Sequence, residues 1–378
     1  MEDGQLIEYG IKREGDDAEM NGDISNLRKD IDRINFELLE MVNRRASILK
    51  EISRLKDDAS MDYFDPVREE KMMEDLVKNN QGPLPNGLVK EIFTAIFKAS
   101  LQYMGINRDR RLLVSSGYDN GFLNIRQMFG LSSDRPIIIA GPCAIEKAEY
   151  LETIAELLSK NGIGFLRGGA FKPRTSPYDF QGLRLEGLKI LKAVGKAFGL
   201  ITVTEVVDTR DVEIVAQYAD VLQIGARNMQ NYEMLKEVGQ ADRPVLLKRG
   251  MSATIQEFIL ASEYIGLQGN RKILLCERGI RTYETKTRNT LDIASIPIVK
   301  KETSLPMLVD LSHSLGRKDI VNPIAKSVLA AGADGLMVEV HPYPEIAVSD
   351  SKQQLTPEEF LELLKFIGMA ANSGIGGE

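Results

Sequence analysis

Four side chains of this sequence could together hold a metal ion. Cys143, His313 and Glu339 each stand at or just after the end of a short apolar run, and Asp350 follows the last of these runs. A thiolate, an imidazole and two carboxylates form a mixed sulfur, nitrogen and oxygen ligand set, which suits a divalent transition ion. We therefore predict a metal site here, with Mn²⁺ as the first choice and Fe²⁺, Co²⁺ and Zn²⁺ as alternatives.

The chain has two cysteines and two histidines, and only Cys143 and His313 are predicted to bind the metal. Taken alone, Cys143 would be interpreted as a small buried apolar residue, and only the joint pattern with His313 and the carboxylates favours a ligand. Cys276 lies in the middle of an apolar run, which predicts a core position. His341 follows Glu339 closely and is predicted to support the site or the fold rather than to bind the metal directly.

Basic side chains recur at the ends of the same apolar runs. They are Arg167, Lys172, Arg227, Lys248 and Arg278, and Glu205 ends a further run. The whole chain is acidic, with 48 Lys and Arg against 55 Asp and Glu and a net charge of −7. Lys and Arg are common in loops, but chance placement fits this recurrence poorly. A local cationic well in an acidic protein indicates a substrate that carries phosphate and carboxylate groups.

Eight β-rich runs must position these side chains. They span residues 137–143, 165–170, 201–206, 221–226, 245–250, 273–279, 307–313 and 335–341. The intervals leave room for a loop and a helix after each run, which predicts an α/β fold, a (β/α)₈ TIM barrel. An open doubly wound sheet is the alternative, but the GxGxxG turn typical of that fold is absent. In a barrel the catalytic groups gather at the C-terminal ends of the strands.

The first third of the chain has the apolar spacing of helices rather than β-rich runs. Apolar residues at helical spacing predict helices over 25–55, 66–76 and 88–104. We expect a flexible tail over 1–23, a helical domain over 24–104, a linker over 105–135, the barrel over 136–368 and a flexible tail over 369–378.

Composition restricts the partners and the location. The negative charge argues against nucleic acid and anionic membranes as partners. No apolar run approaches the roughly 18 residues that span a membrane, and the acidic start lacks the pattern of a signal peptide. We therefore expect a cytoplasmic protein with both cysteines as free thiols.

Several motifs of the predicted barrel closely resemble 3-deoxy-D-arabino-heptulosonate 7-phosphate (DAHP) synthases of the first type, β-subclass. The resemblance covers about 137–365 and rests on LRGGAFKPRTSPYDFQG (166–182), QIGARNMQN (223–231), DLSHSLGRKD (310–319) and VEVHPYPEIAVSDSKQQ (338–354). It implies a transferase that condenses phosphoenolpyruvate with erythrose 4-phosphate in the shikimate pathway, with a divalent metal.

The resemblance also implies a role for each matching residue. The implied metal ligands are Cys143, His313, Glu339 and Asp350, and the implied phosphoenolpyruvate site is Arg167, Lys172, Glu205, Ala226, Arg227, Lys248 and Arg278. Arg174 and Thr175 would contact erythrose 4-phosphate. The predicted catalytic residues are Lys172, as a candidate proton donor, and the metal ligands Cys143 and His313. The rival 3-deoxy-manno-octulosonate 8-phosphate synthases typically carry Lys-Ala-Asn where this chain has Lys-Pro-Arg, which favours erythrose 4-phosphate.

The helical segment resembles the all-helical chorismate mutases, which are isomerases, over about 24–104. The runs LRKDIDRINFELLEMVNRR (27–45) and DPVREE (65–70) place Arg28, Arg45, Lys56, Arg68, Glu69 and Ser100 on that family's binding positions for chorismate and prephenate. Met104 stands where the family has a Gln or Glu donor, and a thioether cannot donate a hydrogen bond. The domain is therefore either a mutase or a non-catalytic module that senses prephenate.

The resemblance also bears on assembly and regulation. The family position of Arg28 serves a partner chain, so a homo-oligomer is expected, either a dimer or a tetramer. The glycines of the 105–135 linker would let the helical domain move and obstruct the barrel.

Overall fold

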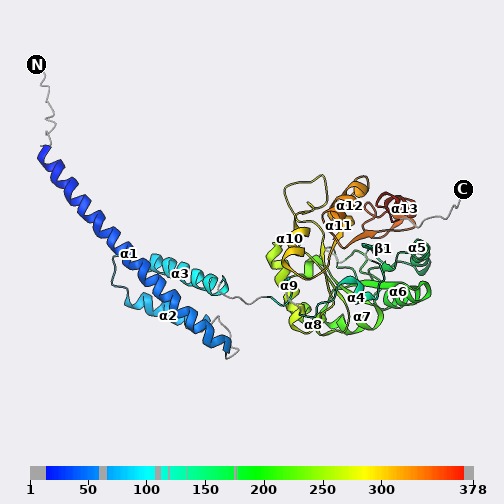
Figure 1. The fold of residues 1–378 in the computed structure, drawn as a ribbon, viewed down its shortest axis with the longest axis horizontal. Coiled ribbons are helices and arrows are strands. Elements are labelled where there is room, and N and C mark those ends of the chain that lie inside the picture. Colours follow the sequence, from blue (N-terminus) through cyan, green and yellow to red (C-terminus); the bar gives the residue numbers. More distant parts are fainter. Residues whose placement is uncertain are drawn as a thin grey trace, which may run out of the picture. The chain divides into compact units, whose positions relative to one another are not determined.

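The chain folds into two compact units, which span Met1–Arg111 and Leu112–Glu378. A computed structural model describes residues 14–58, 66–106, 112–117, 120–133, 135–173, 176 and 178–369. Figure 1 shows that the first unit is helical and that helices surround the strands in the second. The predicted tails lie outside the described residues over 1–13 and 370–378.

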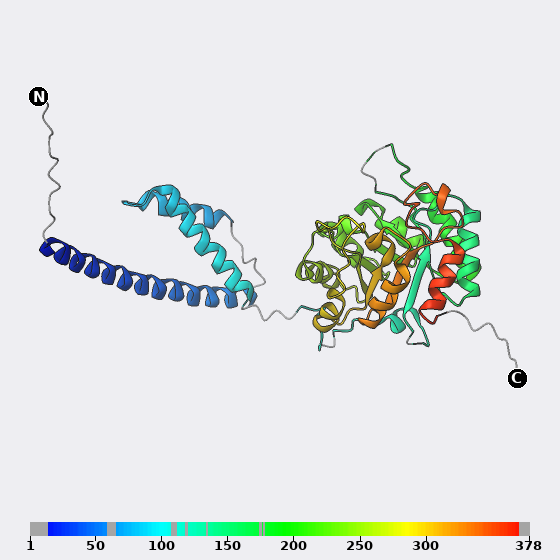
Figure 2. The ribbon, with the colours of Figure 1, turned by 90° about the horizontal axis from the view of Figure 1, so that it is seen from above.

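The first unit consists of α1 (Glu14–Asp58), α2 (Pro66–Asn79) and α3 (Asn86–Ile106). The second half of α1 contacts α3, and α2 contacts α3, whereas the first half extends beyond both (Figures 1 and 2). The expectation of a flexible tail through residue 23 was wrong from Glu14 onward, where the backbone is helical. Once a helix has nucleated, each added residue gains a hydrogen bond, so the helix continues into weakly patterned sequence.

The second unit is a closed barrel of eight parallel strands, β1 to β8 in chain order. The strands are β1 (Ile137–Gly141), β2 (Phe165–Arg167), β3 (Ile201–Val206), β4 (Val221–Ile224), β5 (Val245–Lys248), β6 (Ile273–Glu277), β7 (Met307–Asp310) and β8 (Gly335–Glu339). The strand β1 pairs with β8, with Gly141 opposite Glu339. The predicted barrel is thus confirmed, and all eight strands lie within the predicted runs.

Helices cover the outside of the barrel (Figure 2). They are α5 (Ala148–Lys160), α6 (Leu185–Phe198), α7 (Val212–Tyr218), α8 (Tyr232–Gln240), α9 (Ile255–Leu267), α10 (Ser295–Glu302), α12 (Val321–Ala330) and α13 (Pro357–Phe366), with the short α11 (Leu311–Leu315) after β7. Their buried faces pack against the strands in one large apolar core. A second cluster fills the barrel interior and includes Cys276, which confirms its predicted core position.

Much of the predicted linker belongs to the barrel. Val114 is fully buried in the barrel core, and the Glu263 carboxylate accepts hydrogen bonds from the backbone N–H groups of Leu113 and Val114. The helix α4 (Ile125–Phe129) packs against the interior cluster, where Phe129 contacts Phe165 edge to face. The expectation of a mobile linker over 105–135 was therefore wrong for residues 112–117 and 120–130. Only residues 107–111, which lie outside the described residues, separate α3 from Leu112.

Candidate active site

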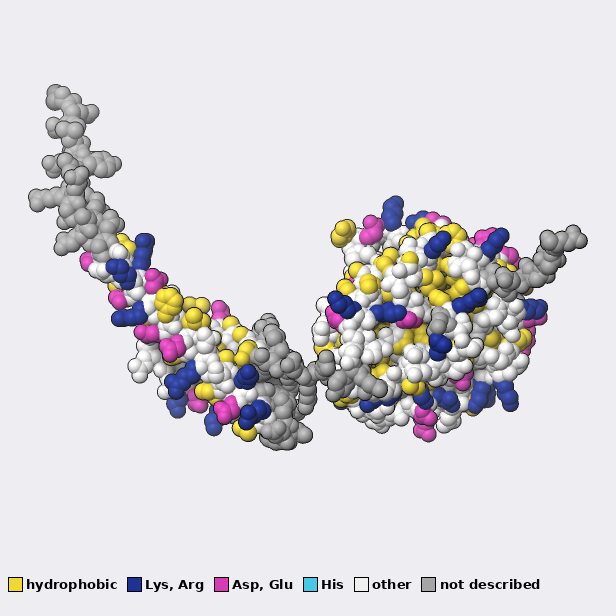
Figure 3. All heavy atoms as spheres, viewed as in Figure 1, with side chains coloured by type: hydrophobic (Ala, Val, Ile, Leu, Met, Phe, Trp, Pro, Cys, Tyr) yellow, Lys and Arg dark blue, Asp and Glu magenta, His cyan; other side chains and the backbone are white. Residues whose placement is uncertain are grey.

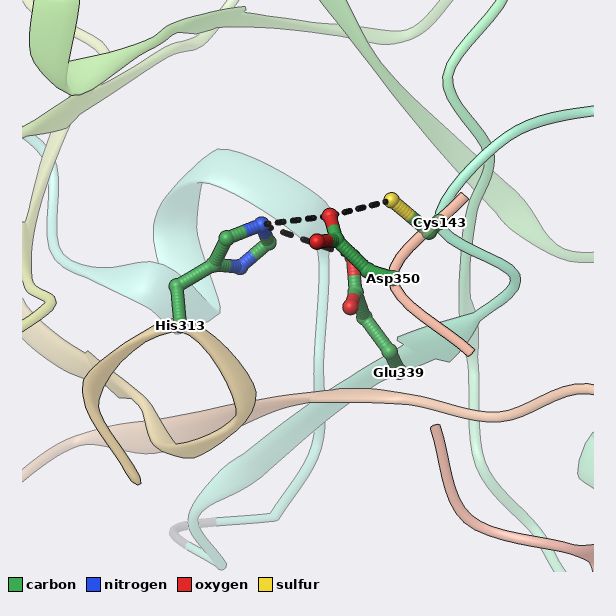
Figure 4. A group of neighbouring side chains, drawn as sticks. All are labelled: Cys143, His313, Glu339 and Asp350. Atoms are coloured by element: carbon green, nitrogen blue, oxygen red, sulfur yellow. Dashed lines mark hydrogen bonds and ion pairs between the residues drawn. The ribbon is translucent and has the colours of Figure 1, made fainter. Parts of the chain in front are cut away.

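The four predicted metal ligands lie together at the C-terminal mouth of the barrel (Figure 4). Each of Cys143, His313, Glu339 and Asp350 offers one ligand atom within 4.8 Å of the others. The Cys143 Sγ lies 3.1 Å from Asp350 Oδ2, and the His313 Nε2 lies 3.5 Å from Glu339 Oε1 and 4.0 Å from Asp350 Oδ2. Three potentially anionic groups at this separation repel one another unless a cation lies among them. The donor set therefore fits a divalent transition ion.

Cys143 is fully buried just after β1. Burial, followed by the negative charge of Glu339, raises the pKa of its thiol to about 12. The ammonium of Lys172 acts in the opposite direction and lies 3.0 Å from the sulfur. A bound cation would favour the thiolate in the same way, because a metal ligand must lose its proton.

Glu339 ends β8 and is fully buried between two donors. Arg167 Nη1 donates to its Oε1 at 2.5 Å, and the amide of Gln353 donates to its Oε2 at 2.5 Å. Burial alone would raise the pKa of Glu339, but His313 and Arg167 outweigh it and hold this pKa well below its usual value. The carboxylate is therefore ionised and fixed in orientation.

Asp350 lies in the loop after β8, where its φ of 50° is unusual for a residue other than glycine. Burial and Glu339 would raise its pKa, but Arg288, the Cys143 thiol and His313 together lower it. The Arg288 guanidinium holds Asp350 Oδ1 at 2.9 Å and also donates to Gln353. Gln354, which is fully buried, accepts from the Cys143 backbone N–H and donates to the Ser349 carbonyl. Gln353 thus links Glu339, through Arg288, to Asp350, and Gln354 links the backbone of Cys143 to that of Ser349.

His313 takes its position from Asp310, the last residue of β7. The Asp310 side chain accepts from the backbone N–H of His313 and so caps the N-terminus of α11. The same carboxylate lies 2.8 Å from His313 Nδ1 and also pairs with Lys248. Burial alone would raise the pKa of Asp310, but His313 and Lys248 hold it well below its usual value.

A pocket of about 300 Å³ is lined in part by two of the four predicted ligands, His313 and Asp350. Its lining is strongly basic and comes from several strand ends: Arg167, Lys172, Arg227, Lys248, Arg278, Arg281 and Arg288, together with Glu205, Gln223 and Ala226. Arg167, Lys248 and Arg278 are at most 5% exposed. A ligand that supplies several negative charges would balance this buried positive charge.

Two backbone features shape the pocket wall. A Cβ on Gly225 would lie 2.1 Å from a carboxylate oxygen of Glu205, so any larger residue here would displace that carboxylate. Glu277 is fully buried at the end of β6, and its Oε1 accepts from the backbone N–H groups of Arg278 and Gly279. It thereby fixes the start of the loop that carries Arg278.

The structure brings together the predicted metal ligands and all seven predicted phosphoenolpyruvate residues. Arg174 and Thr175, predicted for erythrose 4-phosphate, lie outside the described residues. Sequence reasoning did not assign Asp310, Gln353, Gln354, Arg288 or Glu277. Asp310 and Glu277 stand at strand ends, so the strand-end rule itself could have found both. His341 is buried, with its Nδ1 accepting from the Tyr343 N–H and its Nε2 3.7 Å from Glu146.

In the helical unit, Arg45 of α1 reaches α3. Its guanidinium donates to the Ser100 hydroxyl and lies 5.2 Å above the centre of the Phe97 ring. Arg28 is exposed on the first half of α1. The side chains of Lys56, Arg68, Glu69 and Met104 lie outside the described part of the chain.

Apolar side chains are exposed along α1. Leu27, Ile31, Ile34, Leu38 and Met41 are each about half exposed or more. They recur at intervals of three and four residues, so they follow one side of the helix. Figure 3 shows hydrophobic side chains among the charged ones on this helix. Across the described residues, no helix combines the length and the apolar character that crossing a bilayer requires.

Comparison with known proteins agrees with both units. Residues 125–372 match the DAHP synthetase I family, and residues 27–105 match chorismate mutase type II. A phospho-2-dehydro-3-deoxyheptonate aldolase of Thermotoga maritima is 55% identical over 60% of this chain and 68% of its own length. A 2-dehydro-3-deoxyphosphooctonate aldolase of Xanthomonas campestris is 31% identical over 63% of this chain and 92% of its own length.

Solved structures give the same result. The crystal structure of the Thermotoga maritima DAHP synthase has a TM-score of 0.66 at 49% identity, covering 68% of this chain and 76% of that one. A truncated form of the 3-deoxy-D-arabino-heptulosonate 7-phosphate synthase from the same organism has a TM-score of 0.63 at 46% identity, covering 68% of this chain and 95% of that one.

Proposed function

The chain belongs to the DAHP synthetase I family, and on this premise we propose that its barrel condenses phosphoenolpyruvate with erythrose 4-phosphate to DAHP and phosphate. The observation that carries the proposal is the four-donor cluster beside a buried basic pocket at the barrel mouth. The first feature suits a divalent metal, and the second suits a small anion with several charges.

Phosphoenolpyruvate fits the pocket by charge. Its carboxylate and phosphate would be neutralised by Arg167, Lys248 and Arg278, whose buried positions allow strong, oriented hydrogen bonds. Arg227 and Ala226 lie at the wall of the same pocket. Such fixed groups hold the enol carbon ready to attack the aldehyde of the second substrate, which is a positioning effect.

Cys143, His313, Glu339 and Asp350 would hold the metal, which supplies a Lewis acid for the aldehyde oxygen when bound. Lys172 is proposed to protonate that oxygen as the carbon–carbon bond forms. Water then adds to the cationic carbon that results, and phosphate leaves. Burial alone would lower the pKa of Lys172, but the charges of Cys143 and Glu339 raise it, so the ammonium is available as a proton donor. Arg174 and Thr175 are proposed to bind the phosphate of erythrose 4-phosphate.

The relative from Xanthomonas raises a second candidate reaction, formation of an eight-carbon product. That product requires a five-carbon acceptor such as arabinose 5-phosphate in place of erythrose 4-phosphate. Phosphate release should therefore be measured with phosphoenolpyruvate and each acceptor in turn, before and after chelation. We expect turnover with erythrose 4-phosphate, its loss on chelation and its recovery with Mn²⁺. Preference for the five-carbon acceptor, or turnover that resists thorough chelation, would reject the proposal.

For the helical unit we propose binding of chorismate and prephenate, with Arg45 and Ser100 among the contacts. Rearrangement of chorismate to prephenate needs no covalent catalyst, so a rigid cationic site that holds the dicarboxylate compactly is sufficient. The bond between Arg45 and Ser100 joins two helices at the proposed site. Arg28, Lys56, Arg68 and Glu69 are proposed to complete it.

A second copy of this chain is proposed to cover the apolar side of α1. A contiguous apolar stripe is rarely left exposed on a monomer, and the stripe that includes Ile31, Ile34 and Leu38 lies beside Arg28 in the sequence. Pairing of two helical units would bury the stripe and let Arg28 serve the site of the partner. The oligomer is therefore a dimer or a multiple of it.

Finally, we propose that prephenate bound to the helical unit inhibits condensation in the barrel. Prephenate arises downstream of DAHP, so a domain that binds it can report pathway output. Allosteric inhibition requires that prephenate prefer one arrangement of the two units over another. A non-catalytic sensor and a mutase that also senses its product remain the two forms of this proposal.

A further inference from the structure

Asp310 connects the two halves of the proposed barrel site. It ends β7, its side chain is completely buried, and it lies between the metal ligand His313 and the pocket residue Lys248. Its Oδ2 contacts both His313 Nδ1 and the Lys248 ammonium, while its Oδ1 accepts from the His313 backbone N–H. One carboxylate therefore accepts hydrogen bonds both from the proposed metal ligand and from the lysine that lines the proposed substrate pocket.

The contact with His313 fixes which ring nitrogen faces the other ligands. An ionised carboxylate only accepts hydrogen bonds, so His313 Nδ1 must carry a proton to bond Asp310 at 2.8 Å. A neutral ring then has an unprotonated Nε2, and this atom is the one that faces Glu339 and Asp350. Such a partner fixes the orientation and the tautomer of a ligating histidine.

The contact with Lys248 fixes a substrate-facing cation. Lys248 ends β5 and is 4% exposed, so its ammonium has few alternatives for hydrogen bonding or charge balance. Asp310 supplies both without occupying the pocket that Lys248 lines. An uncompensated buried ammonium would be strongly unfavourable.

We propose that Asp310 is a positioning residue that couples metal binding to phosphoenolpyruvate binding, by holding His313 and Lys248 through one shared carboxylate. The inference rests on the proposed metal site and substrate pocket. A residue with a merely structural role would change stability alone. Asp310 should change two separate binding constants, one on each side of its carboxylate.

The test measures Co²⁺ binding by the full-length, metal-stripped protein. The readout is the thiolate-to-cobalt absorption band that Cys143 would give. Asp310→Asn keeps the shape but removes the charge. It should weaken Co²⁺ binding about 10- to 100-fold, the usual effect of losing a partner of a ligating histidine. At saturating metal it should also raise the KM for phosphoenolpyruvate.

A matched control is Asp334→Asn. Asp334 also pairs with a lysine, Lys300, and accepts a backbone N–H at the opposite end of β7. This variant should bind Co²⁺ as the unaltered protein does. Unchanged cobalt affinity and an unchanged KM for phosphoenolpyruvate in Asp310→Asn would overturn this inference but leave the proposed function standing. Absence of cobalt binding in the unaltered protein would instead reject the metal site, and with it the proposed function.

A second measurement needs no variant, in case Asp310→Asn does not fold. The chain has two histidines, so ring ¹⁵N spectra of the Zn²⁺-loaded protein are simple to interpret. His313 should carry its proton on Nδ1. His341 should carry it on Nε2, because its Nδ1 accepts from the Tyr343 N–H. A His313 ring that is protonated on Nε2, or that exchanges its Nδ1 proton as freely as an exposed ring, would contradict the proposed role of Asp310.

Discussion

The barrel mouth and the helical unit differ in how complete their candidate sites are. In the barrel, each proposed ligand is held by a neighbour from the same chain, as Glu339 is by Arg167 and His313 is by Asp310. In the helical unit, Arg45 has a partner on another helix, but Arg28 lies exposed on the half of α1 that extends beyond α2 and α3.

The difference indicates where each site obtains its rigidity. A closed barrel surrounds its mouth with eight strand ends, so one chain can bury several charges and satisfy them. Three helices present too little surface to do the same, and apolar residues such as Ile34 stay exposed. We therefore expect the barrel site to depend on its own residues and the helical site to depend on association.

The largest effect should come from removing two of the proposed metal ligands. The double variant Cys143→Ala, His313→Ala should lose condensation by about 1,000-fold or more, because a bound metal contributes several kcal/mol to such a step. Chorismate turnover should be unchanged, which would separate the two sites. The variant Cys276→Ala controls for loss of a buried thiol and should retain condensation. Full condensation in the double variant would show that these side chains do not hold an essential metal.

Ile34→Glu should have the opposite pattern of effects: it should impair the helical unit and leave condensation in the barrel intact. Burying an uncompensated charge costs about 3–5 kcal/mol, so association of the helical units should be lost. Chorismate turnover, or prephenate binding if there is no turnover, should then fall about 100-fold, while condensation is retained. Sedimentation and both assays check this, with Lys29→Glu on another side of α1 as control. Unchanged association in Ile34→Glu would contradict the proposed dimer surface.

Arg174→Ala should affect one substrate of the barrel. A hydrogen bond to a charged group contributes about 1.5–3 kcal/mol, so kcat/KM for erythrose 4-phosphate should fall about 10- to 100-fold. The KM for phosphoenolpyruvate should change much less, because Arg174 is assigned to the other phosphate. Steady-state kinetics with each substrate varied in turn makes the comparison, and equal losses for both substrates would contradict the assignment.

The smallest expected effect is the coupling between the units. Prephenate should inhibit condensation in the intact chain, with a coupling near the lower end of the usual range, about 5-fold. Arg45→Ala should remove both this inhibition and any chorismate turnover, because both use the same carboxylate-binding side chain. Rates across a prephenate titration of the two proteins decide the matter. Inhibition that persists in Arg45→Ala would place the inhibitor elsewhere.

The sequence predicted most of the barrel because strand ends leave a strong signal. Short β-rich runs with polar ends gave the strands, and Cys143 and His313 followed as scarce residue types at those ends. Asp310 gives a weaker signal than His313 in the same run, because the chain has only two histidines against 55 Asp and Glu. Gln353 and Gln354 were missed because an uncharged amide gives no sign that it will be buried against a ligand.

The segment after α3 was misinterpreted for a different reason. Its apolar residues, such as Val114 and Phe129, follow no regular period, so nothing in the local pattern marks them as buried. Contact with distant elements buries Val114 and partly buries Phe129, and the pairing of Ser115 with Thr303 is one such contact. The glycines at 117, 121 and 130 therefore lie within the barrel unit.

The contrast between a self-contained and a shared site is tested most directly by dilution. Condensation and chorismate turnover should be measured per chain on the same full-length, metal-loaded samples, across concentrations at which sedimentation shows the oligomer dissociating. We expect condensation per chain to stay constant while chorismate turnover per chain falls with the fraction of associated chains. Chorismate turnover that is independent of concentration, or condensation that falls in parallel with it, would contradict this account.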